Sequence, residues 1–407
     1  MPAATSKILG AIEIGTTNVT CLAAEVLSGR SLNIIGMGQC SSEGVKKGEI
    51  VDFKAASSCA HAAIHGAESS ADAQLEGVYL ALTGGHLQGF FQCGSANVSA
   101  SDGLVRKGDV QRAIADGKSK QIPAGRVLIH HIRRHFLLDG RAVAAPVEME
   151  GDRLEVGYWS IHGDERRVRD PIHVVNGFGL TVEDVVISSV AAAAMVVGEE
   201  AKDSGVLVMD IGGGTTDWVL YRGGVVERTG VIAVAGDHLR NDIALGLRVN
   251  AKYAEKLLHE FGKAVLENDD KSEKVWMVGD QMIGDRRIPR ESLIKVINAR
   301  IDELFQIVKK QLGAECSRER IPAGAVITGG LARLPKIAEC AAHALGLPVL
   351  LGRNPKWVRE DLRGPEFSTT LGLLHFALTG TRSEDISSAK DKKEEKSLMK
   401  GLTRFFS

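Results

Sequence analysis

Residues 206–220 read VLVMDIGGGTTDWVL, and this stretch decides the fold. An apolar strand ends in Asp210, a bend follows, and a second apolar strand leaves the bend. The bend consists of Gly212, Gly213, Gly214, Thr215 and Thr216. Glycines let backbone N–H groups close on a phosphate, because no Cβ intervenes and positive φ costs little, and the threonine hydroxyls add donors. Since the carboxylate of Asp210 can hold Mg²⁺ directly or through water, the stretch predicts a hairpin that binds phosphate and a metal ion.

The same pattern occurs near the N-terminus, where residues 8–22 read ILGAIEIGTTNVTCL. Glu13 stands where the other copy has Asp210, and the bend consists of Gly15, Thr16, Thr17 and Asn18. One glycine-rich turn is usually a plain hairpin, but two matched copies half a chain apart indicate an internal duplication. A nucleotide would then lie between two lobes, with one hairpin on each side of its phosphates.

Duplicated hairpins of this kind resemble those of the superfamily that contains actin, sugar kinases and heat-shock chaperones. Residues 325–335 resemble its adenosine motif, in which the purine lies on the backbone of Gly329, Gly330 and Leu331. Residues 188–194 and 368–374 resemble its two connecting helices, whose small side chains allow a close crossing at the hinge. The resemblance implies an α/β fold of two duplicated ribonuclease-H-like lobes.

Within that superfamily the chain resembles the FtsA family of actin-like bacterial division proteins over nearly its whole length. Residues 44–52, 78–86 and 235–244 carry this likeness. The resemblance implies ATP and Mg²⁺ as ligands, with Asp210 on the metal side. Glu13 departs from the more usual Asp by one methylene, which shifts the metal or its water, although division relatives accept Glu there.

The resemblance also assigns residues around the ribose. Gly236, Asp237 and Asn241 would lie near the ribose and phosphates, and Glu255 would accept from ribose hydroxyls. The family often has a Lys three residues after this Glu, where the present chain has Leu258, so a ribose contact is missing or is supplied by a neighbour. A helix cap for Asp237 and a solvated helix face for Glu255 are the alternatives.

A chain of 407 residues is too long for one ordinary core, so we expect several units. Lobe I takes residues 1–83, 174–204 and 366–380, with a small α+β domain inserted at 84–173. Lobe II has a core at 205–239 and 321–365 and an outer subdomain at 240–320. Helical patterns cover 240–262 and 290–312, and a strand is expected at 127–132. A flexible linker at 381–396 and an amphipathic helix at 397–407 end the chain.

Composition and residue spacing argue against several classes of protein. Lys and Arg number 50 against 51 Asp and Glu, so no excess of positive charge favours nucleic acid. The six cysteines show no CxxC spacing, which favours a reducing cytosol. No stretch reaches the ~18 apolar residues that a spanning helix needs. Among His130, His131 and His135, only His131 and His135 have the H-x₃-H spacing of a metal pair, and no nearby Cys completes a tetrad. A solvated basic strand end is the better interpretation.

The C-terminal residues have a character of their own. Residues 381–396 are almost free of apolar side chains and predict a mobile tether. At ~100° per residue, residues 397–407 form a helix with one apolar face, made of Leu398, Met399, Leu402, Phe405 and Phe406, and a basic opposite face that includes Lys400 and Arg404. Such a helix is typical of an anionic membrane surface; a docked terminal helix or a helix for a protein groove is the alternative. FtsA-like chains end in a membrane-targeting helix, which favours the membrane.

The resemblance further implies a partner and a slow reaction. In FtsA-like proteins the outer subdomain of lobe II binds the C-terminal peptide of the tubulin-like protein FtsZ, and residues 296–304 resemble the peptide-binding helix. Arg300 and Glu303 are candidate contacts, with an ordinary i,i+3 surface pair as the alternative. Asp210 and Glu13 are the candidate catalytic carboxylates. Residues 187–195 offer only Ser188 and Ser189 to orient a water, so we expect slow or negligible ATP hydrolysis.

The resemblance therefore implies an ATP-binding division protein that polymerises on the inner face of the cytoplasmic membrane and tethers FtsZ filaments there. The inserted domain would contact further division proteins. A PilM-like scaffold of a pilus machine is the nearest alternative, but it should lack a basic amphipathic terminus. A small-molecule kinase would need an acid–base Asp facing a substrate cleft, and a chaperone would need a separate peptide-binding β-domain.

Overall fold

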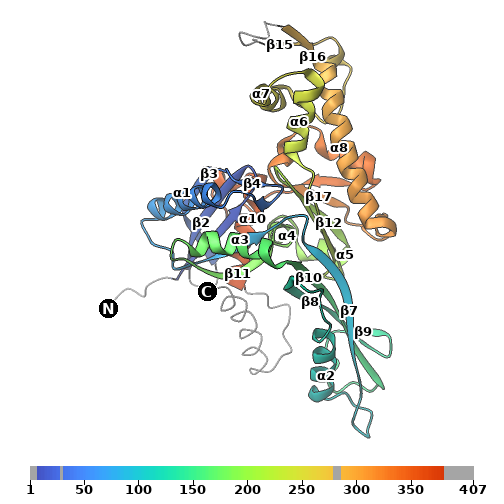
Figure 1. Cartoon of the computed structure of the whole chain (residues 1–407). Coiled ribbons are helices and arrows are strands. Elements are labelled where there is room, and N and C mark those ends of the chain that lie inside the picture. The colour runs from blue at the N-terminus through green and yellow to red at the C-terminus, as the bar shows by residue number, and fades with distance from the viewer. Residues whose placement is uncertain (1–6, 28–30, 278–285, 380–407) are drawn as a thin grey trace.

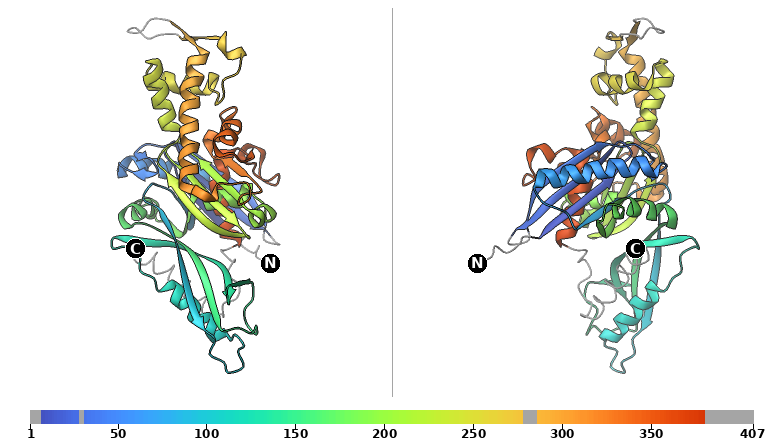
Figure 2. Two further views of the ribbon diagram at one scale, coloured as in Figure 1. Left: turned by 90° about the vertical axis from the view of Figure 1, so that its right-hand side faces the viewer. Right: turned by 60° about the vertical axis from the view of Figure 1, so that its left-hand side comes forward.

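The computed structural model describes residues 7–27, 31–277 and 286–379. Two sheet-based lobes form the centre, and a further unit projects from each end, so the molecule is elongated (Figure 1). Figure 2 shows both projecting units from two other sides. The linker and amphipathic helix expected at 381–396 and 397–407 lie outside the described residues.

Lobe I is built on a five-stranded sheet in the order β11-β6-β1-β2-β3. Its strands are β1 (Ile8–Ile14), β2 (Asn18–Leu27), β3 (Ser31–Ser41), β6 (Gly77–Leu82) and β11 (Thr181–Ile187). A short hairpin of β4 (Val45–Lys46) and β5 (Glu49–Ile50) follows β3 along the chain. Its helices are α1 (Phe53–Ala71), α3 (Glu165–Asn176), α4 (Ser188–Val196) and α10 (Ser368–Thr379). Asp52 caps α1 by accepting a hydrogen bond from the Ala55 N–H. The α1 helix packs so closely on β3 that a Cβ at Gly38 would lie only 1.9 Å from the Ala63 carbonyl oxygen.

Lobe II repeats this topology in a sheet of order β14-β13-β12-β17-β18. Its strands are β12 (Val206–Ile211), β13 (Thr216–Arg222), β14 (Val225–Ile232), β17 (Ala325–Thr328) and β18 (Val349–Leu351), accompanied by helices α5 (Glu199–Ser204) and α9 (Ile337–Leu345). In both sheets the first three strands form an antiparallel meander, and the next two run parallel to the first. The matching order confirms the duplicated fold.

The apolar run of β12 follows from burial on both faces. Val206 and Val208 belong to a core that is continuous with lobe I, whereas Leu207 and Met209 belong to the core of lobe II. A strand buried on both faces needs apolar residues throughout. This is why residues 206–211 show no alternation.

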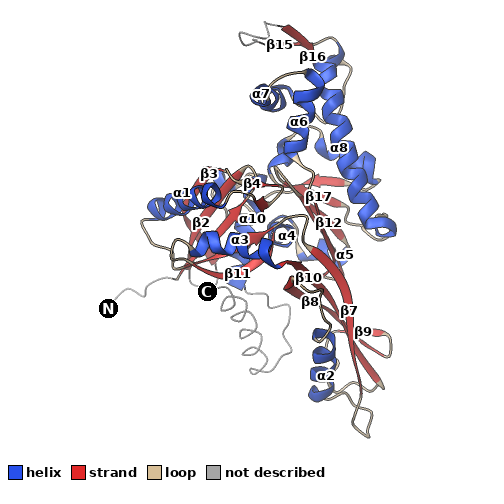
Figure 3. Cartoon of the chain, in the orientation of Figure 1, coloured by secondary structure: helices blue, strands red, loops and turns tan. Residues whose placement is uncertain are grey.

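The lower projection is the inserted domain, a sheet of order β7-β10-β8-β9 with one helix packed on it (Figure 3). Its elements are β7 (Gln88–Asn97), α2 (Lys107–Lys118), β8 (Arg126–Leu138), β9 (Arg141–Val143) and β10 (Arg153–Asp164). The buried residues around α2 form a core of their own, whereas Ile129, Trp159 and Ile161 belong to the core of lobe I. The boundary expected at residue 173 falls inside α3. Because Val168 and Ile172 of α3 are buried in the core of lobe I, α3 packs with that lobe.

The upper projection is the outer subdomain of lobe II. It contains α6 (Gly236–Leu247), α7 (Ala251–Phe261), β15 (Lys274–Met277), β16 (Arg286–Pro289) and α8 (Arg290–Leu312). The helix predicted at 290–312 is confirmed. The pattern at 240–262 is two helices rather than one, because Arg248 adopts a left-handed conformation (φ 53°) and Asn250 caps α7 through the Tyr253 N–H.

Helices α4 and α10 cross between the lobes. A Cβ at Gly372 would lie 1.9 Å from the Ala191 carbonyl oxygen, so the small residues predicted at the hinge do permit a close crossing. Among the described residues, five short 3₁₀ helices complete the chain: η1 (Asp269–Lys271), η2 (Gly313–Glu315), η3 (Gly330–Arg333), η4 (Glu360–Leu362) and η5 (Pro365–Phe367). None of the described helices combines the length and apolar character required to span a bilayer.

Candidate functional site

The two predicted hairpins lie against each other between the lobes. Each closes with the same backbone bond: the Gly15 N–H donates to the Asn18 carbonyl (3.0 Å), and the Gly212 N–H donates to the Thr215 carbonyl (2.9 Å). A Cβ at Gly213 would lie 2.0 Å from Thr17 Oγ1, and one at Gly214 would lie 2.3 Å from Thr16 Oγ1. Glycine is therefore required there, since any side chain would push the two hairpins apart.

Asp210 and Glu13 occupy equivalent places on β12 and β1, and the first turn of α10 contacts both. Thr369 Oγ1 donates to Asp210 Oδ2 (2.6 Å), and Thr370 Oγ1 donates to Glu13 Oε2 (3.4 Å). Burial raises the pKa of both carboxyls, and for Glu13 the charges of Asp210 and Asp217 raise it further. Since burial disfavours the charged form of both carboxylates, a bound cation would stabilise that form.

Asp217 is a third buried carboxyl, which the sequence reasoning did not single out. It lies directly opposite Asp210 in the β12–β13 ladder, an arrangement that is unfavourable for two like charges. Thr83 Oγ1, which comes from lobe I, lies 2.8 and 2.7 Å from the two oxygens of Asp217 and 3.0 Å from Thr215 Oγ1. Burial, aided by the charge of Asp210, raises the pKa of Asp217 to about 7. The signal that could have found it is a departure from the duplication, because the residue opposite Glu13 is Thr20.

The start of α6 is tied to the second hairpin. The Gly236 N–H donates to the Gly212 carbonyl (3.2 Å), and the Asp237 N–H donates to the Gly213 carbonyl (2.7 Å). Arg240 pairs with Asp237 and lies 3.4 Å from Glu255 of α7. The structure thus brings Gly236, Asp237 and Glu255 together.

Two further residues on these helices differ in exposure. Asn241 is exposed one helical turn along α6 from Asp237. Leu258 packs against the core of lobe II, which is the physical consequence of an apolar residue at the position where the family often has a Lys.

The predicted adenosine segment follows β17 and lies beside Asp210. Gly329 has φ 84°, and a Cβ there would lie 2.3 Å from Asp210 Oδ1. Gly330 and Leu331 open the short helix η3, and no atom lies within 4 Å of a Cβ built at Gly330. The backbone at Gly330 is therefore open to a neighbouring flat group.

Arg300 and Glu303, the candidate partner contacts, lie on α8. Arg300 pairs with Asp242 of α6 and lies 2.5 Å from Glu303. The i,i+3 pair is thus present, and Arg300 also ties α8 to α6. No ligand is needed to explain either pair.

The three histidines of β8 have separate surroundings. Burial, together with the charge of His131, lowers the pKa of His130 to about 4, and His130 Nε2 lies 3.4 Å from the Ile187 N–H nitrogen. The expectation of a solvated strand end is therefore wrong for His130. His135 is exposed and contacts the Gly223 carbonyl at 2.7 Å. Within the part of the chain that the structure describes, no three His, Cys, Asp or Glu side chains form a group able to hold a metal.

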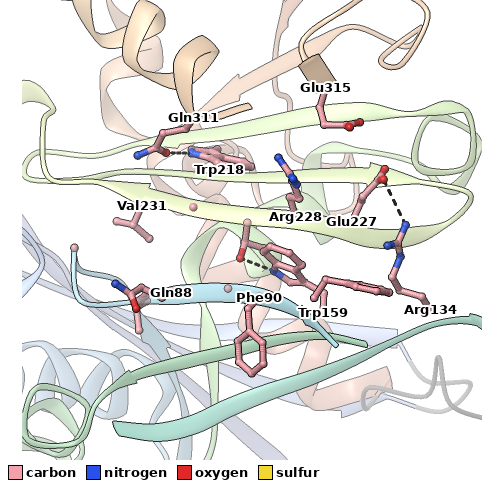
Figure 4. A pocket seen from close by; sticks show the side chains of 16 residues that line it. Gln88, Phe90, Arg134, Trp159, Trp218, Glu227, Arg228, Val231, Gln311 and Glu315 are labelled. Atoms are coloured by element: carbon pink, nitrogen blue, oxygen red, sulfur yellow. Dashed lines mark hydrogen bonds and ion pairs between the residues drawn. The ribbon is translucent and has the colours of Figure 1, made fainter. Parts of the chain in front are cut away.

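A cavity of about 810 Å³ lies apart from the hairpins, between edge strands β7 of the inserted domain and β14 of lobe II (Figure 4). Phe90, Phe91 and Arg134 line one side, and Glu227 and Gln311 line the other. Trp159 Nε1 donates to Thr229 Oγ1 (2.9 Å) beside the cavity. None of the residues in the two hairpin bends, 13–18 and 210–217, borders this space; Trp218, on the strand that leaves the second bend, does.

Comparisons with solved structures agree with the actin-like fold. MreB5 of Spiroplasma citri bound to ADP aligns with a TM-score of 0.55 at 16% identity, over 91% of this chain and 96% of that chain. A PilM–PilN type IV pilus biogenesis complex aligns with a TM-score of 0.61 at 16% identity, over 91% and 98% of the two chains. At these identities the likeness concerns the fold alone.

Comparisons of sequence identify the family. The model of cell division protein FtsA matches residues 207–372, and that of the SHS2 domain inserted in FtsA matches residues 84–162. The FtsA of Escherichia coli K12 is 31% identical over 382 residues, 91% of this chain and 90% of that protein. The FtsA of Pseudomonas aeruginosa is 32% identical over 377 residues, 91% of this chain and 89% of that protein. The chain therefore belongs to the family of the cell division protein FtsA.

Proposed function

We propose that the protein binds ATP between its two lobes. The observation that carries this proposal is the contact of two glycine–threonine hairpins at Gly213 and Thr17, each backed by a buried carboxyl group. Backbone N–H groups and hydroxyls concentrated at one place suit a polyphosphate. The structures of MreB5 bound to ADP and to AMPPNP support the proposal through their common fold.

Mg²⁺ would accompany the nucleotide, with Asp210 as its protein-side ligand and Glu13 holding its water. Both are carboxyl groups whose burial raises the pKa, so a cation would restore a charge that burial disfavours. Mg²⁺ keeps several waters and often takes only one or two protein carboxylates. Asp210 as a direct ligand, with Glu13 acting through water, fits that habit.

Hydrolysis would be slow. In the connecting segment at 187–195, Ser188 and Ser189 are both buried, and Ser188 Oγ donates to the Leu82 carbonyl (3.3 Å). Neither hydroxyl therefore suits the orientation of an attacking water, which γ-phosphate cleavage requires. We propose that the nucleotide controls assembly and that Asp210 and Glu13 support only a slow turnover.

As a member of a division family, the protein would polymerise on the membrane and link FtsZ filaments to the cytoplasmic face of the inner membrane at the division site. The FtsZ peptide would bind at Arg300 and Glu303, and other division proteins would bind the inserted domain. The basic amphipathic sequence at 397–407 supports membrane attachment. Weak single-chain binding would become strong by avidity when chains assemble.

Co-sedimentation with anionic vesicles, ATP and FtsZ tests this function. The full chain should pellet with the vesicles and carry FtsZ with it, whereas a chain ending at Glu395 should leave both in the supernatant. Neutral vesicles serve as the control for the basic face. If the full chain stays in solution with anionic vesicles at every concentration, the tether function is wrong.

A further inference from the structure

The two hairpins contain no positively charged side chain. Residues 13–18 read EIGTTN and residues 210–217 read DIGGGTTD. Glu13, Asp210 and Asp217 instead place three acidic groups there. A triphosphate carries several negative charges, and one divalent ion does not balance them. A cation from another part of the chain would complete the site.

The loop between β4 and β5, formed by Lys47 and Gly48, contacts both hairpins. The Gly48 N–H donates to Thr16 Oγ1 of the first hairpin (3.0 Å). A Cβ at Gly214 of the second hairpin would lie 2.8 Å from Lys47 Cα and 2.9 Å from its nitrogen. The backbone of Lys47 is therefore packed against the second hairpin.

The loop holds Lys47 in an unusual conformation. Lys46 lies opposite Glu49 in the β4–β5 ladder, so Lys47 and Gly48 are the two loop residues of this hairpin. Both have positive φ (53° and 73°). This is the geometry that favours Asn-Gly, and a Lys in the first position is uncommon. A residue held in such a conformation at a site of close contact suggests a functional constraint.

The side chain of Lys47 is exposed, and no ion pair ties it to the described residues. It lies close enough to α6 to act on His238: burial lowers the pKa of His238, and the charges of Lys47 and Arg300 lower it further. His238 Nδ1 is buried without a hydrogen-bond partner among the described residues. The charge of Lys47 thus acts on the start of α6.

We propose that Lys47 and Gly48 form a third phosphate-binding element and that Lys47 contacts the terminal phosphate of a nucleoside triphosphate. The adenosine segment lies at the base of the second hairpin, beside Asp210, whereas Lys47 lies at its tip, beside Gly214. The phosphate farthest from the purine is therefore the one that the ammonium reaches. Lysine binds phosphate as a point charge, so the loop distinguishes ATP from ADP. This inference rests on the proposed ATP site.

Titration of the full chain with ATP and with ADP, each with Mg²⁺, tests the inference. Lys47→Ala should weaken ATP binding by roughly ten- to a hundredfold, as expected for loss of a charged hydrogen bond, and ADP binding by much less. Lys47→Arg should recover part of the ATP affinity. The matched control is Lys46→Ala, which removes an exposed lysine from the neighbouring position and should change neither affinity more than about twofold.

The outcomes separate the two proposals. If the unaltered chain binds ATP and Lys47→Ala binds it equally well, the third element is wrong and the ATP site stands. If Lys47→Ala weakens ATP and ADP equally, or lowers the melting temperature well below that of Lys46→Ala, the loop supports the fold and does not select the triphosphate. If the unaltered chain binds neither nucleotide, the proposed function itself fails.

Discussion

Asp217 is a buried acid whose titration should be visible in the stability of the nucleotide-free protein. Its pKa rises from 3.8 to about 7, chiefly through burial. The folded state then holds the proton more tightly than the unfolded chain, and a raised pKa contributes stability that is lost as pH rises. Between about pH 4 and pH 7 the free energy of unfolding should therefore fall.

Asp217→Asn should remove this loss. The amide stays uncharged and its oxygen can still accept from Thr83. At pH 8 the nucleotide-free variant should be more stable by roughly 2–4 kcal/mol, at about 1.4 kcal/mol per pKa unit, and the advantage should shrink towards pH 4. Urea unfolding across this range measures it. Asp203→Asn, at an exposed acid of α5, is the control, and an equal pH profile for both variants would contradict the explanation.

At the scale of elements, the crossing of α4 and α10 sets the spacing of the lobes. Gly372→Ala would place a methyl group 1.9 Å from the Ala191 carbonyl oxygen, so the helices must move apart. Overpacking of this kind typically costs about 1–3 kcal/mol, and the melting temperature should fall accordingly. Gly198→Ala is the control, because nothing lies within 4 Å of its Cβ. An unchanged melting temperature for Gly372→Ala would mean that the crossing is not tight in solution.

A second element, α8, carries the proposed peptide contact. In the unaltered protein Asp242 and Glu303 flank the guanidinium of Arg300, so Arg300→Glu places a third acid beside them. We expect binding of the FtsZ C-terminal peptide to weaken at least several-fold, because the charge presented to the peptide is reversed, while ATP binding stays unchanged. Lys295→Glu, on the same helix and paired with Glu291, is the control. Peptide affinity that is lowered equally by both variants would indicate a general charge effect.

How far the sequence predicts these elements depends on the range of the interaction. The hairpins and the long helix α8 were predictable, since glycine spacing and helical periodicity are local signals. The break at Arg248 was not, because a left-handed arginine leaves no compositional mark. Asp217 was hidden because its partner Thr83 lies on the other lobe, 134 positions away in sequence. The end of the inserted domain was also hidden, since α3 is amphipathic like any helix and only its contacts place it on lobe I.

At the scale of the whole molecule, ligand binding should stabilise the hydrophobic cores of the described residues to different degrees. The largest core joins lobe I to the inner face of β12 and β13, so the lobes share buried surface. The core around α2 of the inserted domain is separate, whereas Ile129, Trp159 and Ile161 of that domain belong to the core of lobe I. The inserted domain contacts lobe II at β14, where Trp159 Nε1 donates to Thr229 Oγ1 (2.9 Å) and Arg134 lies 3.4 Å from Glu227. Neither contact involves the bends of the two hairpins. Ligand binding stabilises the units that unfold together with the site.

Hydrogen exchange with and without ATP and Mg²⁺ should therefore divide the chain into two classes. Amides of the two hairpins, the β4–β5 hairpin and α6 should exchange more slowly with ATP. Amides of α2 should keep their rates, because α2 packs only within the inserted domain and that domain can open without releasing the nucleotide. ADP should protect the hairpins but leave the β4–β5 loop closer to its ligand-free rate, if Lys47 meets the terminal phosphate. Equal protection of α2 by ATP would show instead that the inserted domain unfolds together with the lobes as one cooperative unit.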